Sequence, residues 1–401
     1  MVIPHPNYTF TSDMFHSTFL PFMEIHLRIC QRLKCIPFVF DKIQKRIRRS
    51  TSVRQIRTSQ AQNIVSMLYV SGMFVNLAIG PLSQIEKFMG FPFLMIFLCA
   101  TIVSWNVGLH IAPAQIVNSF LALEDYFDQM GLPQPPLSLG GKIMKMFIPF
   151  IEVSIASVAF LIPVILTVMP CMPPFILSMM PNCKSTMASG SSWGLVGLVV
   201  HIAETWVALN ILYAGSLWIF YILFVGTTCL TNYLDILGCK VRQIVTGHDK
   251  HGCILLYRCI QILEKSYNAA MMHGLLPAMM FCSPAVQVVG LFVCISFRDE
   301  LENPEFLVFP LMVVNAAINN IVTFTMAAAV QNASFKGLLA IRQKATKPQR
   351  QPTVSRELKS CSLMKIRVGE GSCLDRGTPL VIQTFCINQT VSLAVLRSSK
   401  V

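Results

Sequence analysis

The sequence predicts an all-α membrane protein with seven transmembrane helices, a cytoplasmic amino terminus and an extracellular carboxyl terminus. Of its 401 residues, 54% are hydrophobic and only 13% are charged, and the mean hydropathy is +0.59. So few charges could not cover the surface of a soluble protein. Seven stretches free of Asp, Glu, Lys and Arg reach the roughly 20 residues that a helix needs to cross a bilayer. Basic residues gather in alternate connecting segments.

The predicted spans follow from these charge-free stretches. A single Glu204 cannot supply a turn, so the apolar stretch before it belongs to one long fourth helix. The spans are residues 63–83, 91–112, 145–168, 198–226, 271–295, 307–330 and 378–396. The connecting segments are a basic cytoplasmic segment 1–62, an extracellular loop 169–197, cytoplasmic helical extensions 227–270, a basic cytoplasmic segment 331–377 and an extracellular tail 397–401.

The distribution of basic residues sets the predicted orientation. Segments on the amino-terminal side of the membrane hold 27 Lys and Arg, and those on the other side hold 5. Cytoplasmic loops carry the excess of positive charge, so the amino terminus is predicted inside. This orientation argues against a G-protein-coupled receptor, a family whose amino terminus is outside. It also accounts for the net charge of +13 without a nucleic-acid partner.

Two apolar stripes continue helically beyond the membrane, so helices 4 and 5 are predicted to extend into the cytoplasm. Each stripe must be buried, either within the chain or at a subunit interface. The basic segment from Lys336 to Arg376 is predicted to be partly flexible, because two prolines interrupt it. The stripes are Leu230, Leu234, Leu237 and Val241 after span 4, and Leu256, Ile260, Leu263 and Tyr267 before span 5.

Ionisable residues inside spans are costly, which makes them candidates for function. Glu152 lies about two turns into the third span and is a candidate ligand contact. The alternative is a carboxylate near the membrane interface that is neutralised by Lys145. His110 at the end of the second span and His201 in the fourth are further ligand-pocket candidates, with helix capping or packing as the alternative.

The sequence offers no catalytic or cofactor-binding constellation, so neither an enzyme nor a cofactor is predicted. His248, His251 and Cys253 lack a fourth ligand at suitable spacing, which favours a solvated turn over a metal site. Cys171 and Cys183 both fall in the predicted extracellular loop. Their spacing allows a disulfide there without requiring one.

The seventh span is unusually polar. Thr384 and Asn388 share one helical face, as do Gln389 and Ser392. These four residues are the candidate pore lining, and helix packing through polar contacts is the alternative. The six polar side chains of this span are Gln383, Thr384, Asn388, Gln389, Thr390 and Ser392. In the sixth span, hydrogen bonds between helices are favoured over pore lining for Asn315, Asn319 and Asn320.

The stretch 371–389 resembles the last helix of the arthropod gustatory and odorant receptor superfamily. That family typically has an Asp-Arg pair, a leucine, Thr-Tyr, an apolar run and Gln-Phe. The Gln-Phe pair is absent at positions 391–392, and Gln389 comes two positions early. The matching residues, with Phe in place of Tyr, are Asp375, Arg376, Leu380, Thr384 and Phe385.

The resemblance implies a chemosensory receptor, with the gustatory type preferred over the odorant type. Such a protein would be a ligand-gated non-selective cation channel in the plasma membrane of chemosensory neurons. It would bind a small tastant or odorant and assemble in the lipid bilayer as a homo- or hetero-tetramer, with the seventh helices lining one pore. The alternatives are a secondary transporter and a metabotropic seven-span receptor; the absence of a visible internal repeat disfavours the transporter.

Overall fold

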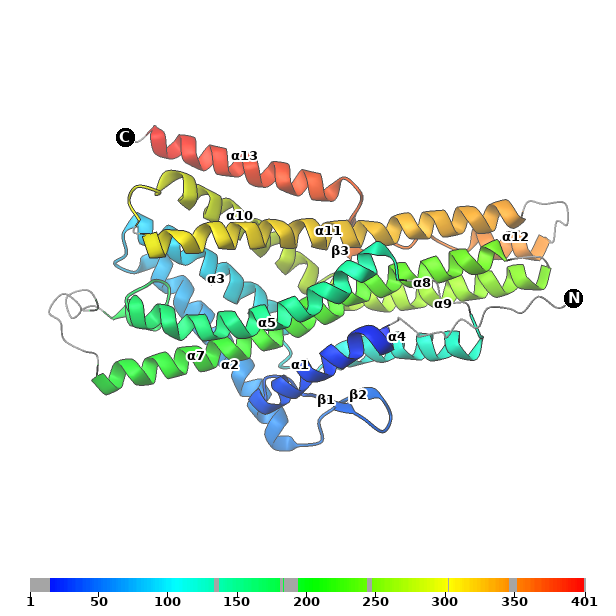
Figure 1. The fold of residues 1–401 in the computed structure, drawn as a ribbon, viewed down its shortest axis with the longest axis horizontal. Coiled ribbons are helices and arrows are strands. Elements are labelled where there is room, and N and C mark those ends of the chain that lie inside the picture. Colours follow the sequence, from blue (N-terminus) through cyan, green and yellow to red (C-terminus); the bar gives the residue numbers. More distant parts are fainter. Residues whose placement is uncertain are drawn as a thin grey trace, which may run out of the picture.

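The computed structural model describes residues 15–132, 137–180, 183, 194–243, 247–301, 303–345 and 352–399, and they are mainly helical (Figure 1). Within these ranges seven helices are long and apolar enough to cross a membrane. Each overlaps one predicted span, which confirms an all-α fold with seven candidate membrane helices, while the orientation of the termini stays a prediction. The seven are Val53–Ile79, Gln84–Ser104, Leu139–Val168, Leu195–Arg242, Leu275–Ser296, Phe306–Lys344 and Thr378–Ser398.

The elements up to the third span begin with a π-helix. They are η1 Phe15–Phe19, α1 Leu20–Leu33, β1 Phe38–Asp41, β2 Arg46–Arg49, α2 Val53–Ile79, α3 Gln84–Ser104, α4 Ala112–Gln129 and α5 Leu139–Val168. The later elements are η2 Ile176–Met179, α7 Gly194–Ser216, η3 Leu217–Phe224, α8 Val225–Arg242, α9 Gly247–Met271, α10 Leu275–Ser296, α11 Asn303–Ala345, α12 Pro352–Lys359, β3 Arg367–Val368, β4 Ser372–Cys373 and α13 Thr378–Ser398.

The second span ends earlier than predicted. Helix α3 starts at a capping box between Ser83 and Glu86 and stops at Ser104, although residues 105–112 are uncharged. Asn106 turns the chain there, because its side chain accepts a bond from the His110 amide at 2.7 Å and donates to the His110 carbonyl at 3.0 Å. Helix α4 then follows, which the sequence analysis did not predict.

The amino-terminal segment is not a loose cytoplasmic arm. Helix α1 buries Met23, His26 and Cys30 completely, and it packs against α5 and α7. Strands β1 and β2 form an antiparallel hairpin in which Phe38 pairs with Arg49. Part of the segment predicted to be cytoplasmic is therefore a structural element of the bundle.

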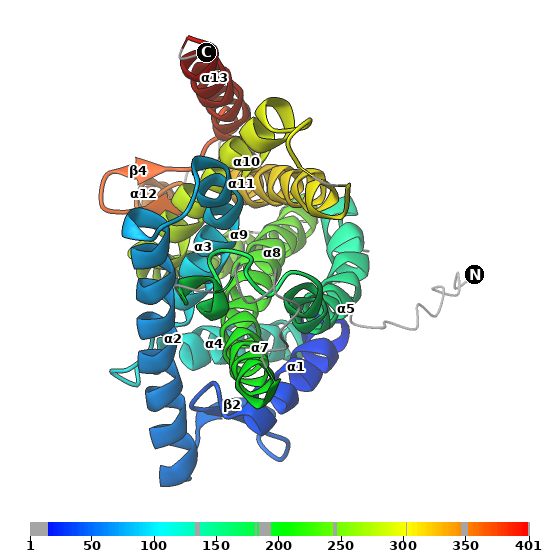
Figure 2. The ribbon, with the colours of Figure 1, turned by 90° about the vertical axis from the view of Figure 1, so that its left-hand side faces the viewer.

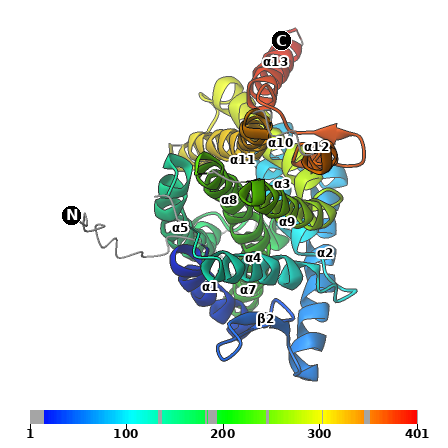
Figure 3. The ribbon, with the colours of Figure 1, turned by 90° about the vertical axis from the view of Figure 1, so that its right-hand side faces the viewer.

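The two apolar stripes are buried within the chain. All eight of their side chains are at most 5% exposed, because α8 and α9 pack together and against α11 (Figures 1 and 3). Intramolecular packing is therefore the alternative that holds. The basic segment from Lys336 begins as a helix, because α11 continues to Ala345 and packs on α8. Residues 346–351, with Pro348, lie outside the described residues, and the partial flexibility of the segment stays a prediction.

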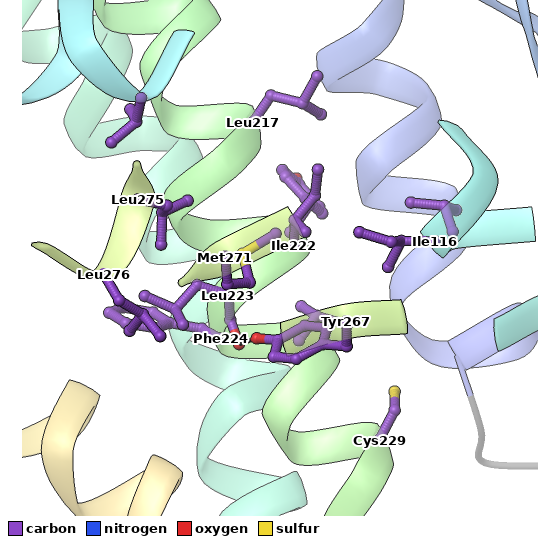
Figure 4. Close-up of a cluster of buried hydrophobic side chains, with 14 of the residues drawn as sticks. Ile116, Leu217, Ile222, Leu223, Phe224, Cys229, Tyr267, Met271, Leu275 and Leu276 are labelled. Carbon is purple, nitrogen blue, oxygen red and sulfur yellow. Dashed lines mark hydrogen bonds between the residues drawn. The ribbon is translucent and has the colours of Figure 1, made fainter. Parts of the chain in front are cut away.

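A cluster of buried apolar side chains lies where the chain breaks between α9 and α10. Met271, Leu275 and Leu276 flank this three-residue break and point toward Leu223 and Phe224 of η3 (Figure 4). All five side chains are buried. The break therefore joins the membrane-spanning part of the bundle to its helical extensions.

The two ends of the molecule hold different segments. One end collects the ends of α8, α9 and α11 together with α12, all from segments predicted to be cytoplasmic (Figure 1). The opposite end holds the end of α13 and the turn between α10 and α11, which are predicted to be extracellular (Figure 1). The ends of α8, α9, α11 and α12 thus lie together, whereas the basic β1–β2 hairpin lies beside the middle of the molecule (Figure 1).

Candidate functional site

Helix α13 lies along the outside of the bundle and is packed by one face only (Figures 1 and 2). Its buried residues are Cys386 and Thr390. The Thr390 hydroxyl donates to the Val288 carbonyl of α10 at 3.3 Å and to the Cys386 carbonyl at 2.8 Å. Cys386 and Thr390 lie one turn apart and define the face of α13 that packs against α10.

A chain of amide groups joins α13 to two neighbouring helices. Gln287 of α10 donates to the Gln383 side-chain oxygen at 2.7 Å, and Asn320 of α11 donates to the Gln287 oxygen at 2.8 Å. Asn319 donates to Ser283 at 3.3 Å. Bonds between helices were predicted for these asparagines, and such bonds satisfy amides that hydrocarbon would leave without partners.

The opposite face of α13 is exposed and carries the predicted pore residues. Thr384, Asn388 and Ser392 are all exposed and recur every four residues, so they form one stripe. Gln389 is also exposed but lies about 100° around the helix from Asn388. The stripe is turned away from the Cys386–Thr390 face. In this chain Thr384, Asn388 and Ser392 thus lie on the side of α13 away from its own bundle, and Gln389 lies on the flank.

The family motif begins with Asp375, whose side chain is bonded to the start of α13. One oxygen of Asp375 accepts bonds from the amides of Gly377 and Thr378, both at 3.0 Å, and from the Thr378 hydroxyl at 2.9 Å. The hydrogen bond from the Thr378 hydroxyl holds the pKa of Asp375 below its usual value. Asp375 therefore satisfies amide groups that the first turn of a helix leaves without partners.

The other motif residues face outward. Leu380 is 73% exposed and Phe385 is 51% exposed. Arg376 and Asp375 line a pocket of about 330 Å³ between the start of α13 and α11, where Gln331 and Asn332 form the facing wall. The motif therefore combines a helix start with side chains that are free to meet a neighbouring molecule.

The far end of α13 is fixed by Arg397. Its guanidinium donates to the Ser296 carbonyl and pairs with Glu300, at the turn after α10. The same group lies 3.9 Å from the centre of the Phe297 ring. Helix α13 is thus attached at its middle and at its end, in both cases to α10 or to the turn that follows it.

The segment that leads into α13 is bonded to α9 and α11. The Tyr257 hydroxyl bonds with Ser334 of α11 and donates to the Ser362 carbonyl, both at 2.8 Å. The Asn268 side chain donates to the Lys365 carbonyl at 2.8 Å and accepts from the Arg367 amide at 3.0 Å. Helix α9 is therefore hydrogen-bonded directly to the segment that leads into α13.

The predicted ligand contact Glu152 has partners that the sequence analysis did not identify. One of its oxygens bonds with His26 of α1 at 2.8 Å and accepts from the Tyr221 hydroxyl at 2.6 Å. His26 is fully buried, and its other ring nitrogen bonds with the Tyr213 carbonyl at 2.9 Å. The arrangement attaches α1 to the bundle and gives this carboxylate buried hydrogen-bond partners, while its neutralisation by Lys145 stays a prediction.

The other two ligand-pocket candidates lie apart from Glu152 and from each other. His201 is on α7, and its Nδ1 is buried with no partner among the described residues. His110 follows α3 and lines a pocket of about 680 Å³. The three candidates therefore do not form one site.

No metal-binding group of His, Cys, Asp or Glu is found in the described part of the chain. His251, which was considered for such a site, bonds with Glu357 at 3.0 Å.

The loop after α5 folds onto the bundle. A disulfide joins Cys171 and Cys183, whose Cα atoms are 5.8 Å apart. The buried carboxylate of Glu204 on α7 accepts a bond from the Ile176 amide, and Asn76 of α2 donates to Ser178 at 2.9 Å. The described part of this loop therefore covers the ends of α2 and α7.

Comparison with known proteins identifies the fold. No protein-family profile and no curated protein matches the sequence. Among solved structures, the insect olfactory receptor OR5 from Machilis hrabei is similar, with a TM-score of 0.63 and 12% identity over 94% of this chain and 97% of that one. The same receptor in complex with eugenol gives a TM-score of 0.59 and 12% identity, over 94% and 98%.

The chain has the insect olfactory receptor fold. This is the fold that the carboxyl-terminal motif led us to expect, and it extends over nearly the whole length of both chains. At 12% identity the likeness establishes the fold and leaves the function to be argued from the site. The hydrogen bond that joins α13 to Gln287 of α10 was not predicted from the sequence.

Proposed function

We propose that the chain is a chemosensory receptor of the insect odorant and gustatory receptor superfamily and that it forms a ligand-gated, non-selective cation channel. The observation that carries this proposal is the exposed stripe of Thr384, Asn388 and Ser392 on α13, opposite the face that Thr390 buries. Facing lipid, the Asn388 amide would lack partners, at a cost of a few kcal/mol. Facing a water-filled pore, it would be solvated.

The proposal requires more than one subunit, because one α13 cannot enclose a conduit. Four copies around an axis would bring four such stripes together, as the resemblance to the superfamily implies. The Gln287–Gln383 bond would hold each helix to its own subunit while Leu380 and Phe385, both exposed, meet neighbouring subunits or lipid. The assembly would be a homo- or hetero-tetramer in the plasma membrane of a chemosensory neuron.

The orientation in the proposal comes from charge. With 27 basic residues on one side of the membrane and 5 on the other, the amino terminus would be cytoplasmic and the carboxyl terminus extracellular. The disulfide-bonded loop would then lie outside, in an oxidising environment that suits it. The helical extensions α8 and α9 would lie in the cytoplasm.

The ligand in the proposal is a small, mainly apolar molecule, either a tastant or an odorant. The olfactory receptor with the similar fold was solved with eugenol, and the motif resemblance favours a gustatory type. Of the three histidine and glutamate candidates, we retain His201 as a ligand contact, because its Nδ1 lacks a partner among the described residues. Glu152 is assigned to the attachment of α1 instead.

Recording of whole-cell current tests the proposal. Cells expressing the full chain, alone and with candidate co-receptors, are exposed to a panel of tastants and odorants, with antibody staining of tags at both ends. We expect a cation current evoked by at least one compound, an amino-terminal tag reached only after permeabilisation, and a carboxyl-terminal tag reached on intact cells. A tag pattern with the amino terminus outside would contradict both the orientation and the channel.

A further inference from the structure

The pocket beside His110 is a cavity that no part of the proposed function uses. Its volume is about 680 Å³, within the range of small-molecule sites. It lies at the end of α3 away from the disulfide-bonded loop, because that loop contacts the other half of α3, with Pro173 3.3 Å from where a Cβ on Gly90 would lie. Its walls include Thr101, Trp105, His110, Trp218, His273 and Gly274.

The interior of the pocket has one polar group without a partner. Thr101 is 1% exposed, and its hydroxyl has no hydrogen-bond partner among the described residues. A buried hydroxyl without a partner is unfavourable. The Asn106 side chain, by contrast, is fully used by the backbone of His110. The pocket therefore offers one deep hydrogen-bonding position within a mainly aromatic and aliphatic wall.

We propose that this pocket binds a small neutral amphipathic molecule, with its apolar body between Trp105 and Trp218 and a hydroxyl or carbonyl group bonded to Thr101. A lipid acyl chain would fill the apolar volume but leave the Thr101 hydroxyl without a partner. An anion or a cation would have no buried charge to pair with, since both histidines at this pocket are exposed at its edge. A neutral molecule with one polar group would both fill the apolar volume and give the Thr101 hydroxyl a partner.

The pocket borders the break between α9 and α10. Ala269, Ala270, His273 and Gly274 form one wall, while Met271 on the other side of the same turn points into the core (Figure 4). The Met272 carbonyl of this break accepts a bond from the Gly369 amide at 3.0 Å. A molecule in the pocket therefore contacts the element that holds the approach to α13.

The site is accordingly a modulatory one: its occupant stabilises the break in the conformation that fixes the segment 365–369. An effect of this segment on the ion current depends on the proposed function of α13. Binding in the pocket and ordering of the segment do not depend on it, so both are tested without measuring a current.

Photolabelling of the full chain in lipid nanodiscs tests binding, with the diazirine probe 3-azioctanol. We expect saturable adducts on the pocket wall, at Trp105, Trp218 or His273, that excess octanol prevents and octane does not. Thr101→Val should raise the probe concentration at half-saturation roughly five- to tenfold, which corresponds to the loss of one hydrogen bond. Thr323→Val is the matched control, because its buried hydroxyl also lacks a partner among the described residues and lies outside this pocket.

A second variant keeps the test valid if Thr101→Val fails to fold. Ala269→Phe fills the pocket from its exposed wall without touching Thr101 and should abolish the adducts. Hydrogen exchange of residues 363–370 should slow when octanol is added to the wild type and stay unchanged in Ala269→Phe. Adducts that octane prevents equally, or that survive both substitutions, would show that the cavity holds water or lipid only and would overturn the proposal. If binding appears without any evoked current, the site stands and the channel function fails.

Discussion

Gln287 on α10 and Gln383 on α13 are joined by an amide hydrogen bond of 2.7 Å, and the oxygen of Gln287 accepts a second bond from Asn320. The two glutamines are 96 residues apart in sequence. Their bond is a polar contact between α10 and α13 beside Thr384, the first residue of the exposed stripe. It gives α13 a fixed rotation about its own axis, because only one face can present Gln383 to α10.

This bond predicts a measurable coupling between the two residues. Gln287→Leu and Gln383→Leu should each destabilise the protein, and the double variant should cost less than the sum of the two. The coupling should be about 0.6–1.7 kcal/mol, the range found for polar contacts between membrane helices. Thermal unfolding of the four proteins in one detergent measures it. Strict additivity would mean that the amides do not interact in the membrane.

The start of α13 should depend on Asp375. Asp375→Ala removes the acceptor for the amides of Gly377 and Thr378, so hydrogen exchange of residues 377–381 should speed up. Asp375→Asn keeps a side-chain oxygen in the same place and should exchange nearly as slowly as the wild type. Equal protection in Asp375→Ala and the wild type would show that α13 starts without this cap.

Glu124 on α4 predicts a pH dependence of stability. Its carboxylate is buried and accepts bonds from the Phe15 and His16 amides and from the Tyr233 hydroxyl. Burial raises its pKa from 4.5 to about 7. The folded state therefore keeps the proton that the unfolded state loses first, and stability from this group falls as pH rises from about 4.5 to about 7.

Unfolding temperatures measured between pH 4.5 and 8 test this direction. Glu124→Gln should flatten the fall in that window, because the amide does not titrate. The matched control is Asp125→Asn, which removes the exposed carboxylate next to it and should leave the fall in place. A fall that persists unchanged in Glu124→Gln would assign it to another group.

The attachment of α1 to the bundle should depend on His26. His26→Ala removes the 2.8 Å partner of Glu152 in a mostly buried position, and the loss of one partner of a buried polar group costs about 1–3 kcal/mol. Adding Glu152→Gln should restore part of that loss, because an amide that keeps the Tyr221 partner is less costly to bury than a carboxylate with only that partner. Proteolysis within residues 33–52 of the purified protein reports whether α1 has come away. Unchanged resistance in His26→Ala would mean that the other buried residues of α1 suffice.

The number of spans could be read from the sequence because crossing the bilayer requires a long uncharged run, and few other structures do. The ends of the helices could not. Residues 105–112 are as free of charge as the helix before them, yet a side-chain bond of Asn106 to the backbone of His110 ends α3 first. Helix α4 was missed because its charged residues placed it among the connecting segments.

Contacts between residues distant in sequence could not be predicted either. Glu152 was recognised as unusual, but His26 lies in a segment that the hydropathy assigned to the cytoplasm. The polar residues of the last span were recognised as well. Which of them face the bundle depends on Gln287, on a different helix, so sequence could group Thr384 with Asn388 but could not tell that Gln383 and Thr390 are the packed pair.

The central claim is that the exposed stripe of α13 lines an aqueous pore, and cysteine accessibility tests it most directly. Thr384→Cys, Asn388→Cys and Ser392→Cys should each react with a charged thiol reagent applied from outside, faster in the presence of an activating ligand, and the reaction should block the current. Gln389→Cys, on the flank, should react more slowly. Thr390→Cys, on the buried face, is the control and should not react. The wild type, in which Cys294 is partly exposed and Cys373 is exposed, gives the background reaction that is subtracted. If the three stripe positions stay unreactive while Thr390→Cys reacts and blocks, α13 does not line the pore with this face, and the account is contradicted.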